Sequence, residues 1–282
     1  MFKTLWQKPK GFVIIKEKRR LALRRNTFMD IKIIIALHKP YWVPADPVYL
    51  PLHVGKKGKA DIGFLGDDSG DHISGRNGTF CELTGLYWAW KNLQAEYAGL
   101  VHYRRYFTNR EVRNIPGRKA QILRQKDWEM LLTACPVVVA DKRRYYIETN
   151  RSHYNHAHPG VSLDLAGQII KEKYPGYADA FSLVMDRTWA HMFNMFVMRK
   201  DLFDSYCEWL FSILFELEKR LDISSFDSYN SRVFGFVGER LLDVWLEKNR
   251  IPYKEQNVSF LEKQNWIIKG GLFLKRKFWG RG

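Results

Sequence analysis

The sequence predicts an α/β fold in which a buried sheet is flanked by helices. Short apolar runs of strand length recur along the chain, and polar or charged residues follow each of them at once. Longer segments repeat their apolar side chains at helical spacing, as expected for helices that pack against a sheet. With 282 residues, of which 46% are hydrophobic, the chain can bury a substantial core rich in aromatic rings.

The first predicted strand covers residues 31–37 (IKIIIAL), a β-rich apolar run. His38, Lys39 and Pro40 follow it directly and indicate a loop. Residues 40–78 lack periodicity and are rich in Pro, Gly and Asp. They predict a long functional loop with the segment GDDSGD (66–71) at its centre.

A helix is predicted over residues 81–93, where Leu83, Leu86 and later apolar residues recur at helical spacing. Thr79 and Glu82, just ahead of this run, have the spacing of a capping box, in which each side chain bonds the other's backbone N–H. We therefore interpret Glu82 first as a cap, with the role of catalytic base as the alternative.

Two further predicted strands lead into charged residues. Residues 97–101 (YAGLV) run into His102, Arg104 and Arg105, and residues 136–140 (PVVVA) end at Asp141 and three basic residues. In open α/β sheets the carboxyl edge of the strands is where ligands bind. The side chains that follow these strands are therefore candidates for a binding site.

The C-terminal half predicts a helical stretch over residues 164–185 that is broken near Pro175, a strand over 192–198 (MFNMFVM), and amphipathic helices over 202–221 and 233–246. Asn194 is polar inside the apolar strand, so it needs a ligand hydroxyl or a backbone group as partner if it is buried. Glu239 and Arg240 lie inside the last helix, where an ordinary ion pair is the simpler interpretation and a site role the alternative.

The net charge of +16 is concentrated at the two ends of the chain. Residues 1–25 carry nine basic side chains and one acidic one, and residues 269–282 carry five basic side chains and no acidic one. The residues between these segments therefore have a net charge of only about +3. We predict a basic N-terminal extension (1–29), a central domain (30–258) and a basic, aromatic C-terminal tail (259–282).

Large apolar side chains such as Phe2, Trp6, Trp266 and Trp279 stand among these terminal charges. This composition is typical of segments that lie in an anionic lipid interface. Peripheral attachment to a membrane is our hypothesis for the ends, and plain solvated tails are the alternative. Nucleic-acid binding is disfavoured because no recognised nucleic-acid motif accompanies the charge.

The expected cellular location follows from the absence of a membrane span, a signal peptide and paired cysteines. No apolar run approaches 18 residues, and charges interrupt the first ten residues too often for a signal peptide. The three cysteines are far apart and form no C-x-x-C pair, which argues against a disulfide framework and against a cysteine-built zinc site. We expect a cytoplasmic protein.

Arg104 and Arg105 are the strongest indication of chemistry. A guanidinium binds phosphate oxygens bidentately and stays charged at physiological pH, so a diphosphate is the expected ligand. These arginines could stabilise the charge that develops on a nucleotide diphosphate as it leaves. Surface ion pairs are the alternative role.

The acidic and histidine-rich segments leave more than one interpretation open. Asp67, Asp68 and Asp71 suit a divalent cation or ribose hydroxyls, but they equally suit ordinary turns. The spacing of His153, His156 and His158 matches no standard metal-ligand pattern; these side chains suit sugar hydroxyls or a general base, or they are solvated or core histidines.

The segments CELTGLYW (81–88) and GLVHYRRYF (99–107), together with Asn77, Lys91 and Asn92, resemble a family of bacterial capsular and exopolysaccharide glycosyltransferases known as DUF4422. IKIIIALHKP, DDSGDHIS, MFNMFVM and RVFGFVGERLLDVW also resemble it, so the resemblance covers roughly residues 30–250. It implies a GT-A-like fold with a Rossmann-type mixed sheet. It also implies transfer of a hexose, pyranose or furanose, from a nucleotide sugar, expected to be a UDP-hexose.

Enzymes of this fold usually hold a metal with an Asp-x-Asp at a strand end, whereas here the comparable strand end reads His102-Tyr103-Arg104. We therefore assign no metal ligands; positive side chains can replace the cation, and a divalent metal is the alternative that stays open. The acceptor that the resemblance implies is a lipid-linked surface polysaccharide, which places the enzyme on the inner face of the plasma membrane. A non-catalytic peripheral membrane or polyanion-binding protein is the alternative function.

The roles that we expect for individual residues follow from this picture. The expected catalytic residues are Arg104, Arg105, His102, Glu82 and His156. The expected donor-binding residues are His38, Asp68, Asp71, Asn77, Asp141 and Asn194. The expected acceptor-binding residues are His153, His158, Glu239 and Arg240.

Overall fold

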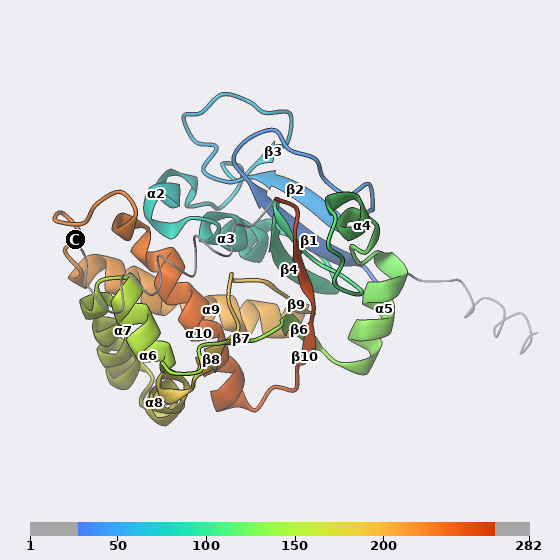
Figure 1. The fold of residues 1–282 in the computed structure, drawn as a ribbon. Helices are drawn as coiled ribbons and strands as arrows, with labels where there is room; N and C mark the ends of the chain where they lie inside the picture. The colour runs from blue at the N-terminus through green and yellow to red at the C-terminus, as the bar shows by residue number, and fades with distance from the viewer. Residues whose placement is uncertain (1–27, 263–282) are drawn as a thin grey trace, which may run out of the picture.

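The computed structural model describes residues 28–262, which form a nine-stranded mixed sheet flanked by helices (Figure 1). The predicted fold class is confirmed. The strands are β1 (Ile31–Leu37), β2 (Tyr49–His53), β3 (Leu65–Gly66), β4 (Tyr97–His102), β5 (Arg105–Phe107), β6 (Val137–Ala140), β9 (Phe196–Arg199), β10 (Lys254–Gln256) and β11 (Val258–Phe260). A separate two-stranded sheet pairs β7 (Arg143–Arg144) with β8 (Trp189–Ala190).

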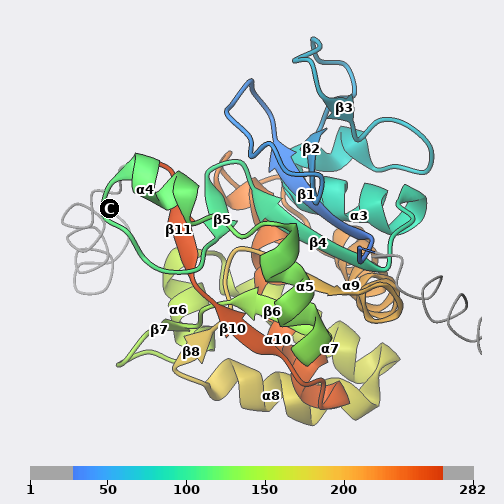
Figure 2. The same cartoon turned by 90° about the vertical axis from the view of Figure 1, so that its right-hand side faces the viewer.

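Helices pack against both faces of the sheet. Those described are α2 (Asn77–Phe80), α3 (Leu83–Asn92), α4 (Ile115–Ala120), α5 (Gln125–Ala134), α6 (Asn150–Ala157), α7 (Gly160–Lys173), α8 (Ala178–Asp186), α9 (Lys200–Arg220) and α10 (Val233–Asn249). The 3-10 turns are η1 (Ser74–Arg76), η2 (Pro175–Tyr177) and η3 (Asn230–Arg232). Helices α3, α9 and α10 cover one face of the sheet and α5 covers the other (Figure 2).

β1 is buried on both faces, because its side chains alternate between two hydrophobic cores on opposite sides of the sheet. Ile34 and Ala36 point into the core that includes α3, α9 and α10, whereas Ile33 and Ile35 point into the core that includes Trp128 of α5. A strand covered on both sides carries a continuous apolar run instead of an alternating pattern. This is why IKIIIAL could be predicted as a strand from its composition alone.

The order of the sheet, β10-β6-β9-β4-β1-β2-β3, creates a place for a ligand. β1 pairs in parallel with β2 on one side and with β4 on the other. The chain passes from β1 to β2 and β3 on one side and later returns to β4 on the other side, so the strand order reverses at β1. In open α/β sheets ligands bind at the carboxyl ends of the strands at such a point. His38 and His102 lie at this edge.

The long periodic elements were predicted correctly. The first strand coincides with β1, and β4 and β6 lie where apolar runs were found. The two long amphipathic segments correspond to α9 and α10, and Pro175 separates α7 from α8.

Two predictions near the start of the chain were wrong. Residues 40–78 are not one continuous loop, because they contain β2, β3 and η1 and lead into α2. The predicted helix 81–93 begins at Leu83, since Cys81 has a left-handed backbone (φ 53°) that separates α2 from α3. There is no capping box: Glu82 makes no cap hydrogen bond, and the Thr79 hydroxyl donates to the Arg76 carbonyl.

The predicted strand 192–198 is correct only in its second half, because β9 begins at Phe196. Phe193 (φ 78°) and Asn194 (φ 51°) are both left-handed, a conformation that ends a strand and that costs about 1–3 kcal/mol for each non-glycine residue. Backbone strain of this kind persists where surrounding contacts enforce it.

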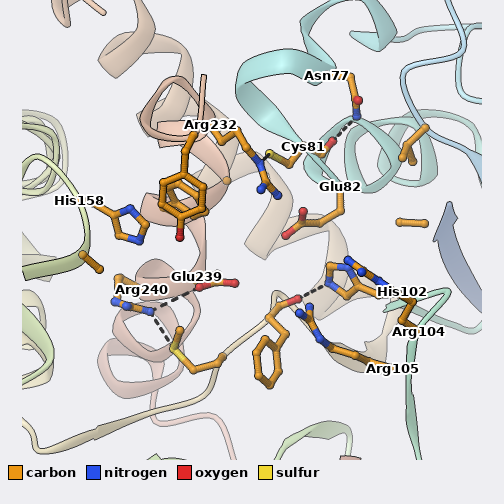
Figure 3. Close-up of a pocket in the computed structure, with 18 of the residues that line it drawn as sticks. Asn77, Cys81, Glu82, His102, Arg104, Arg105, His158, Arg232, Glu239 and Arg240 are labelled. Carbon is orange, nitrogen blue, oxygen red and sulfur yellow. Dashed lines mark hydrogen bonds and ion pairs between the residues drawn. The ribbon is translucent and has the colours of Figure 1, made fainter. Parts of the chain in front are cut away.

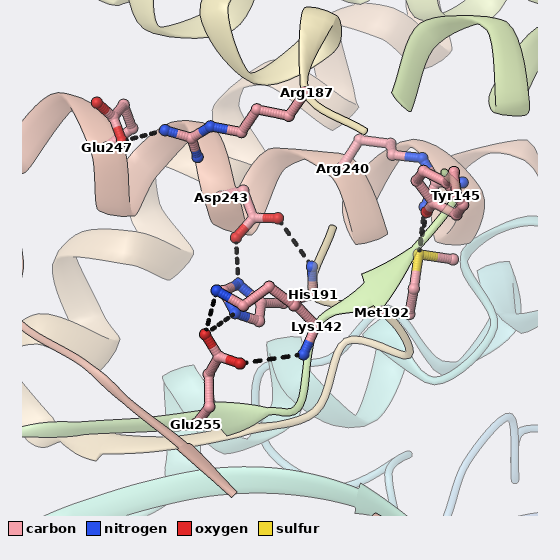
Figure 4. Close-up of polar contacts among 9 residues, drawn as sticks. All are labelled: Lys142, Tyr145, Arg187, His191, Met192, Arg240, Asp243, Glu247 and Glu255. Atoms are coloured by element: carbon pink, nitrogen blue, oxygen red, sulfur yellow. Dashed lines mark hydrogen bonds and ion pairs between the residues drawn. The ribbon is translucent and has the colours of Figure 1, made fainter. Parts of the chain in front are cut away.

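Those contacts come from α10, along which residues 187–194 run as an anchoring segment (Figure 4). Arg187 pairs with Glu247 at one end of the segment. The His191 backbone N–H donates to the Asp243 carboxylate at 2.9 Å, and its Nδ1 lies 2.5 Å from the same group.

The anchoring segment keeps contact with α10 up to the cavity described below. Arg240 Nη1 donates to Met192 Sδ at 2.8 Å, and Asn194 Nδ2 donates to the Gly235 carbonyl at 3.3 Å. The segment therefore follows about three turns of the helix from Glu247 back to Gly235, and each turn of α10 fixes a further residue.

Replacing Asp243 by alanine is expected to lower the free energy of unfolding by about 3–5 kcal/mol, because it leaves the buried His191 ring and backbone N–H without their acceptor. Chemical denaturation measures this loss. Glu208→Ala, on the exposed face of α9, is the matched control and should change stability by less than about 0.5 kcal/mol. Equal stability of the two variants would contradict this role of Asp243.

The ends of the described region bear on the predicted domain organisation. The boundary predicted between residues 258 and 259 falls within β11, which pairs with β5, and Leu261 is buried. Most of the predicted extension (1–29) and tail (259–282) lies outside the described residues. Within residues 28–262, no helix is both long and apolar enough to cross a membrane. Cys81, Cys135 and Cys207 are all free thiols.

Candidate active site

A cavity of ≈ 790 Å³ lies at the carboxyl ends of β1 and β4, between the sheet and helices α2, α6 and α10 (Figure 3). Its volume is in the range of sites for small molecules and cofactors. The structure brings together here most of the predicted site residues: His38, Asn77, Glu82, His102, Arg104, Arg105, His153, His156, His158, Glu239 and Arg240.

His102, the last residue of β4, has a fixed tautomer. Its Nε2 lies 2.7 Å from the Phe193 carbonyl, which can only accept, so Nε2 carries the hydrogen and the other ring nitrogen is the acceptor when the ring is neutral. Burial lowers the pKa of His102, and Arg105 lowers it further, against the opposing effect of Glu82. His102 is therefore a neutral imidazole at pH 7.

The two arginines after β4 are in different environments. Arg104 is half-exposed, donates to Glu262 at 3.0 Å and stacks on the Tyr103 ring. Arg105 packs its guanidinium on Phe193, 4.4 Å from the ring centre, and on Phe260, and no described residue forms an ion pair with it. Burial lowers the pKa of Arg105, but a guanidinium remains charged. Arg105 is thus a half-buried cation at the cavity wall.

Glu82 is held by Asn194 behind it. Asn194 Nδ2 donates to Glu82 Oε1 at 2.7 Å, and Asn194 itself does not line the cavity. The structure therefore places Asn194 behind a carboxylate of the cavity, to which it is hydrogen-bonded, and not at the cavity surface. The left-handed turn at Phe193 and Asn194 orients two side chains of the cavity. The Phe193 carbonyl accepts a hydrogen bond from His102, and the Asn194 side chain donates one to Glu82.

We expect Asn194→Gly to lower kcat about tenfold with only a small loss of stability, because glycine accepts the left-handed backbone but does not hold Glu82. Asn194→Ala should in addition lower the free energy of unfolding by about 1 kcal/mol, since alanine disfavours this backbone. Turnover and thermal unfolding measured on both variants separate the two effects. Full turnover in Asn194→Gly would show that Glu82 needs no such support.

Glu239 and Arg240 form the opposite wall, on α10. Figure 3 shows the carboxylates of Glu82 and Glu239 extending into the same space from opposite sides. Burial raises the pKa of Glu239 and the charge of Glu82 adds to this rise, while Arg240, at 3.6 Å, and Arg105 oppose it. A carboxylate with a raised pKa is suited to proton transfer.

The three histidines of the SHYNHAH segment lie on α6 and at its C-terminus. His153 stacks on Tyr145, and burial, together with Arg240 and Arg143, lowers its pKa to about 3. His158 stacks on Phe236 with ring centres 3.9 Å apart. His156 Nδ1 lies 2.6 Å from the buried carboxylate of Glu148. They therefore form a ring-lined wall of the cavity.

Three predicted donor-binding residues lie elsewhere. Asp68 is exposed, and Asp71 accepts a hydrogen bond from the Tyr87 hydroxyl, so neither lines the cavity. Asp141 lines a neighbouring cavity. Asp67 is buried and accepts hydrogen bonds from the backbone of residues 55 and 56 and from Ser74, so its role is to close the loop. The alternative interpretation of this segment as turn chemistry fits Asp67.

Several residues of the cavity were given no individual role from the sequence. Arg143, Glu148 and Arg232 all line it, and Arg232 Nε donates to Cys81 Sγ at 3.1 Å. Arg143 follows the strand at 136–140 and could have been found by the strand-end argument that identified Arg104. Glu148 and Arg232 stand in segments without a comparable pattern.

The residues at the end of β4 do not suit the divalent cation that GT-A-like enzymes usually hold. Such cations prefer several oxygen ligands, and this strand end offers one imidazole and two guanidinium groups. Within residues 28–262 no three His, Cys, Asp or Glu side chains are grouped so that they could hold a metal ion.

Comparisons with known proteins identify a matching family and a similar solved structure. A family model described as domain of unknown function DUF4422 matches residues 32–250. The apo structure of WbbM, described as a bifunctional glycosyltransferase, is similar with a TM-score of 0.76 and 30% sequence identity. The similarity covers 83% of this chain and 46% of that one, so the chain spans about half the length of this neighbour. The search of curated proteins found no match.

Proposed function

The chain belongs to the DUF4422 family, and we propose that it is a glycosyltransferase that passes a hexose from a nucleotide diphosphate sugar to a glycan. The observation that carries this proposal is the position of Arg104 and Arg105 at the wall of a large cavity, at the strand edge where α/β sheets bind ligands. The GT-A-like fold that the chain shares with a glycosyltransferase supports it.

The donor diphosphate fits the β4 side of the cavity. Guanidinium groups bind phosphate oxygens in a fork, and Arg105 has no described carboxylate partner to displace. Arg104 lies at the half-exposed edge of the cavity, near His38. It suits the phosphate next to the nucleoside of the donor, and we expect that nucleoside to be uridine. Arg105 then faces the phosphate that leaves.

The transfer step needs three events. The bond between the sugar C1 and the phosphate oxygen breaks, the acceptor hydroxyl oxygen forms a bond to C1, and the hydroxyl proton goes to a base. Arg105 stabilises the negative charge that grows on the leaving diphosphate. No metal ion takes part in the transfer step that we propose.

Glu239 is our candidate for the base. Its raised pKa gives it a greater affinity for the proton than an ordinary carboxylate has, and it extends into the cavity opposite the β4 residues. Glu82, oriented by Asn194, suits a hydrogen bond to a hydroxyl of the donor sugar. His102, neutral and fixed by Phe193, suits the same purpose.

We further propose that the acceptor is a surface polysaccharide assembled on a lipid, and that the enzyme acts at the inner face of the plasma membrane. This proposal rests on the basic, aromatic composition of residues 1–25 and 266–282. Co-sedimentation with vesicles tests it: binding should increase with the fraction of anionic lipid, and indifference to lipid charge would contradict it.

Thermal unfolding in the presence of nucleotides tests the proposed donor. A ligand bound by the folded state raises the melting temperature, so UDP should raise it more than uridine does. A donor screen followed by product analysis then identifies the sugar. Stabilisation by vesicles but by no nucleotide in the panel would favour the non-catalytic alternative.

We expect chelation of divalent cations to leave the transferase activity within about twofold of the untreated rate, because arginines stand where a metal would neutralise the diphosphate. The measurement is the initial rate with and without excess EDTA. Complete loss of activity that Mg²⁺ or Mn²⁺ restores would contradict this prediction.

A further inference from the structure

A second cavity of ≈ 860 Å³ adjoins the first one. The two cavities share the side chains Arg105, Arg143, His153 and Phe193 in their walls. The second cavity therefore lies directly beside the one in which Arg105 faces the proposed donor. We refer to these two adjoining cavities as the donor compartment and the second compartment.

The second compartment is strongly basic. Among the described residues that line it are six cationic side chains and two carboxylates, Glu111 and Asp141. The cationic side chains are Arg105, Arg113, Arg118, Lys142, Arg143 and Arg144. Such an excess of one charge in a cleft attracts ligands of the opposite charge.

Two of these cations already have partners. Arg118 donates to the carbonyls of Val112 and Phe260, each at 2.7 Å, and Lys142 pairs with Glu255 at 2.6 Å.

Arg113, Arg143 and Arg144 form no ion pair within residues 28–262, and all three are exposed. Arg143 and Arg144 form β7, whose pairing with β8 fixes their backbone. They are thus placed to bind an anion.

The compartment also offers apolar surface. Phe193, Phe260 and Val258 contribute to its wall, and Tyr146 lies at its edge with 81% of its surface exposed. Tyr146 has a left-handed backbone (φ 61°), a strained conformation that is typical of functional positions. Aromatic rings in this setting can pack against the apolar face of a sugar ring.

We propose that this second compartment is the acceptor subsite and that it binds a glycan carrying negative charge. This inference rests on the proposed transferase function. The charge has two possible sources, a uronic acid carboxylate in the glycan or the diphosphate that joins a glycan to its lipid. In both cases Arg113 and Arg144 bind the anion, and the sugar packs on Tyr146 and extends toward Arg105.

The test is calorimetric titration of the full chain in saturating UDP, which occupies the donor compartment. The probes are tetragalacturonate for the carboxylate source, farnesyl diphosphate for the diphosphate source and maltotetraose as the neutral glycan. We expect at least one anionic probe to bind more tightly than maltotetraose. Arg113→Glu and Arg144→Glu should each weaken that probe about tenfold.

Arg110→Glu is the matched control, because it makes the same charge change at an exposed arginine that lines neither cavity. The proposal is overturned if neither anion binds better than maltotetraose, or if Arg110→Glu weakens binding as much as Arg144→Glu does. Far-UV circular dichroism confirms that the variants are folded. The same titrations are repeated without UDP, so that anion binding is tested independently of the donor. If UDP fails to stabilise the wild type, this result contradicts the donor proposal and not the acceptor proposal.

Discussion

Replacing Arg105 by alanine is expected to lower kcat by about 10²- to 10³-fold, the effect of removing one preorganised group that stabilises developing negative charge. The effect is large because Arg105 is half-buried and has no ion-pair partner among the described residues, so its charge is available to the diphosphate that we propose leaves there. Arg104→Ala should have a smaller effect, about tenfold, since Arg104 is half-exposed and paired with Glu262. Steady-state kinetics with a purified donor measures both.

Arg105→Met separates charge from packing. Arg105 packs on Phe193 and Phe260, and methionine retains an apolar side chain between these rings while it removes the guanidinium. We expect Arg105→Met to lose as much turnover as Arg105→Ala. A methionine variant within about threefold of the wild-type rate would mean that the arginine acts only through packing.

Glu239→Gln is expected to lower kcat by about 10²- to 10⁴-fold, the usual contribution of a general base. Glutamine keeps the size of the side chain but cannot take the proton of the acceptor hydroxyl. Glu208→Gln, on an exposed face, is the control and should leave kcat unchanged. Wild-type turnover in Glu239→Gln would assign the base elsewhere.

The pH dependence gives an independent test of Glu239. A base must be ionised, so wild-type activity should fall as pH drops through the pKa of Glu239 in the folded protein. Burial raises this pKa above the ordinary glutamate value of 4.5, so the acidic limb of the pH–rate profile should lie above that value. The limb should be absent in Glu239→Gln. A limb that persists unchanged would belong to another group.

The long elements were predictable from the sequence because their burial leaves a pattern of apolar residues. IKIIIAL is apolar throughout because β1 is covered on both sides, and the apolar spacing in α9 and α10 reflects one buried helix face. The elements that escaped prediction lack such patterns. β2 contains Pro51, β10 consists of three polar residues, and α6 reads NRSHYNHA.

The candidate site was predictable where residues follow a recognisable strand. His38, His102, Arg104 and Arg105 all lie at the cavity because the carboxyl ends of parallel strands meet at one edge.

The Asp-rich segment could not be placed in this way, since its position depends on how a loop folds back over β2 and β3. Asp67 turned inward as a buried acceptor, while Asp68 and Asp71 remained exposed.

The role of Asn194 depended on backbone geometry that composition does not reveal. The sequence MFNMFVM has the composition of a strand, but contacts with α10 hold Phe193 and Asn194 in left-handed conformations. These contacts come from residues about 40 positions later in the chain, so no local pattern could predict them. What the sequence did indicate was that a buried asparagine in this position needs a partner, and Glu82 and Gly235 are those partners.

Calorimetric titration with UDP and with uridine tests the diphosphate site most directly. The wild type should bind UDP at least about tenfold more tightly than uridine, because we propose that two arginines donate charge-assisted hydrogen bonds to the diphosphate. The double variant Arg104→Ala/Arg105→Met should lose this preference. Equal affinities in the wild type, or an undiminished preference in the double variant, would contradict the placement of the diphosphate at the end of β4.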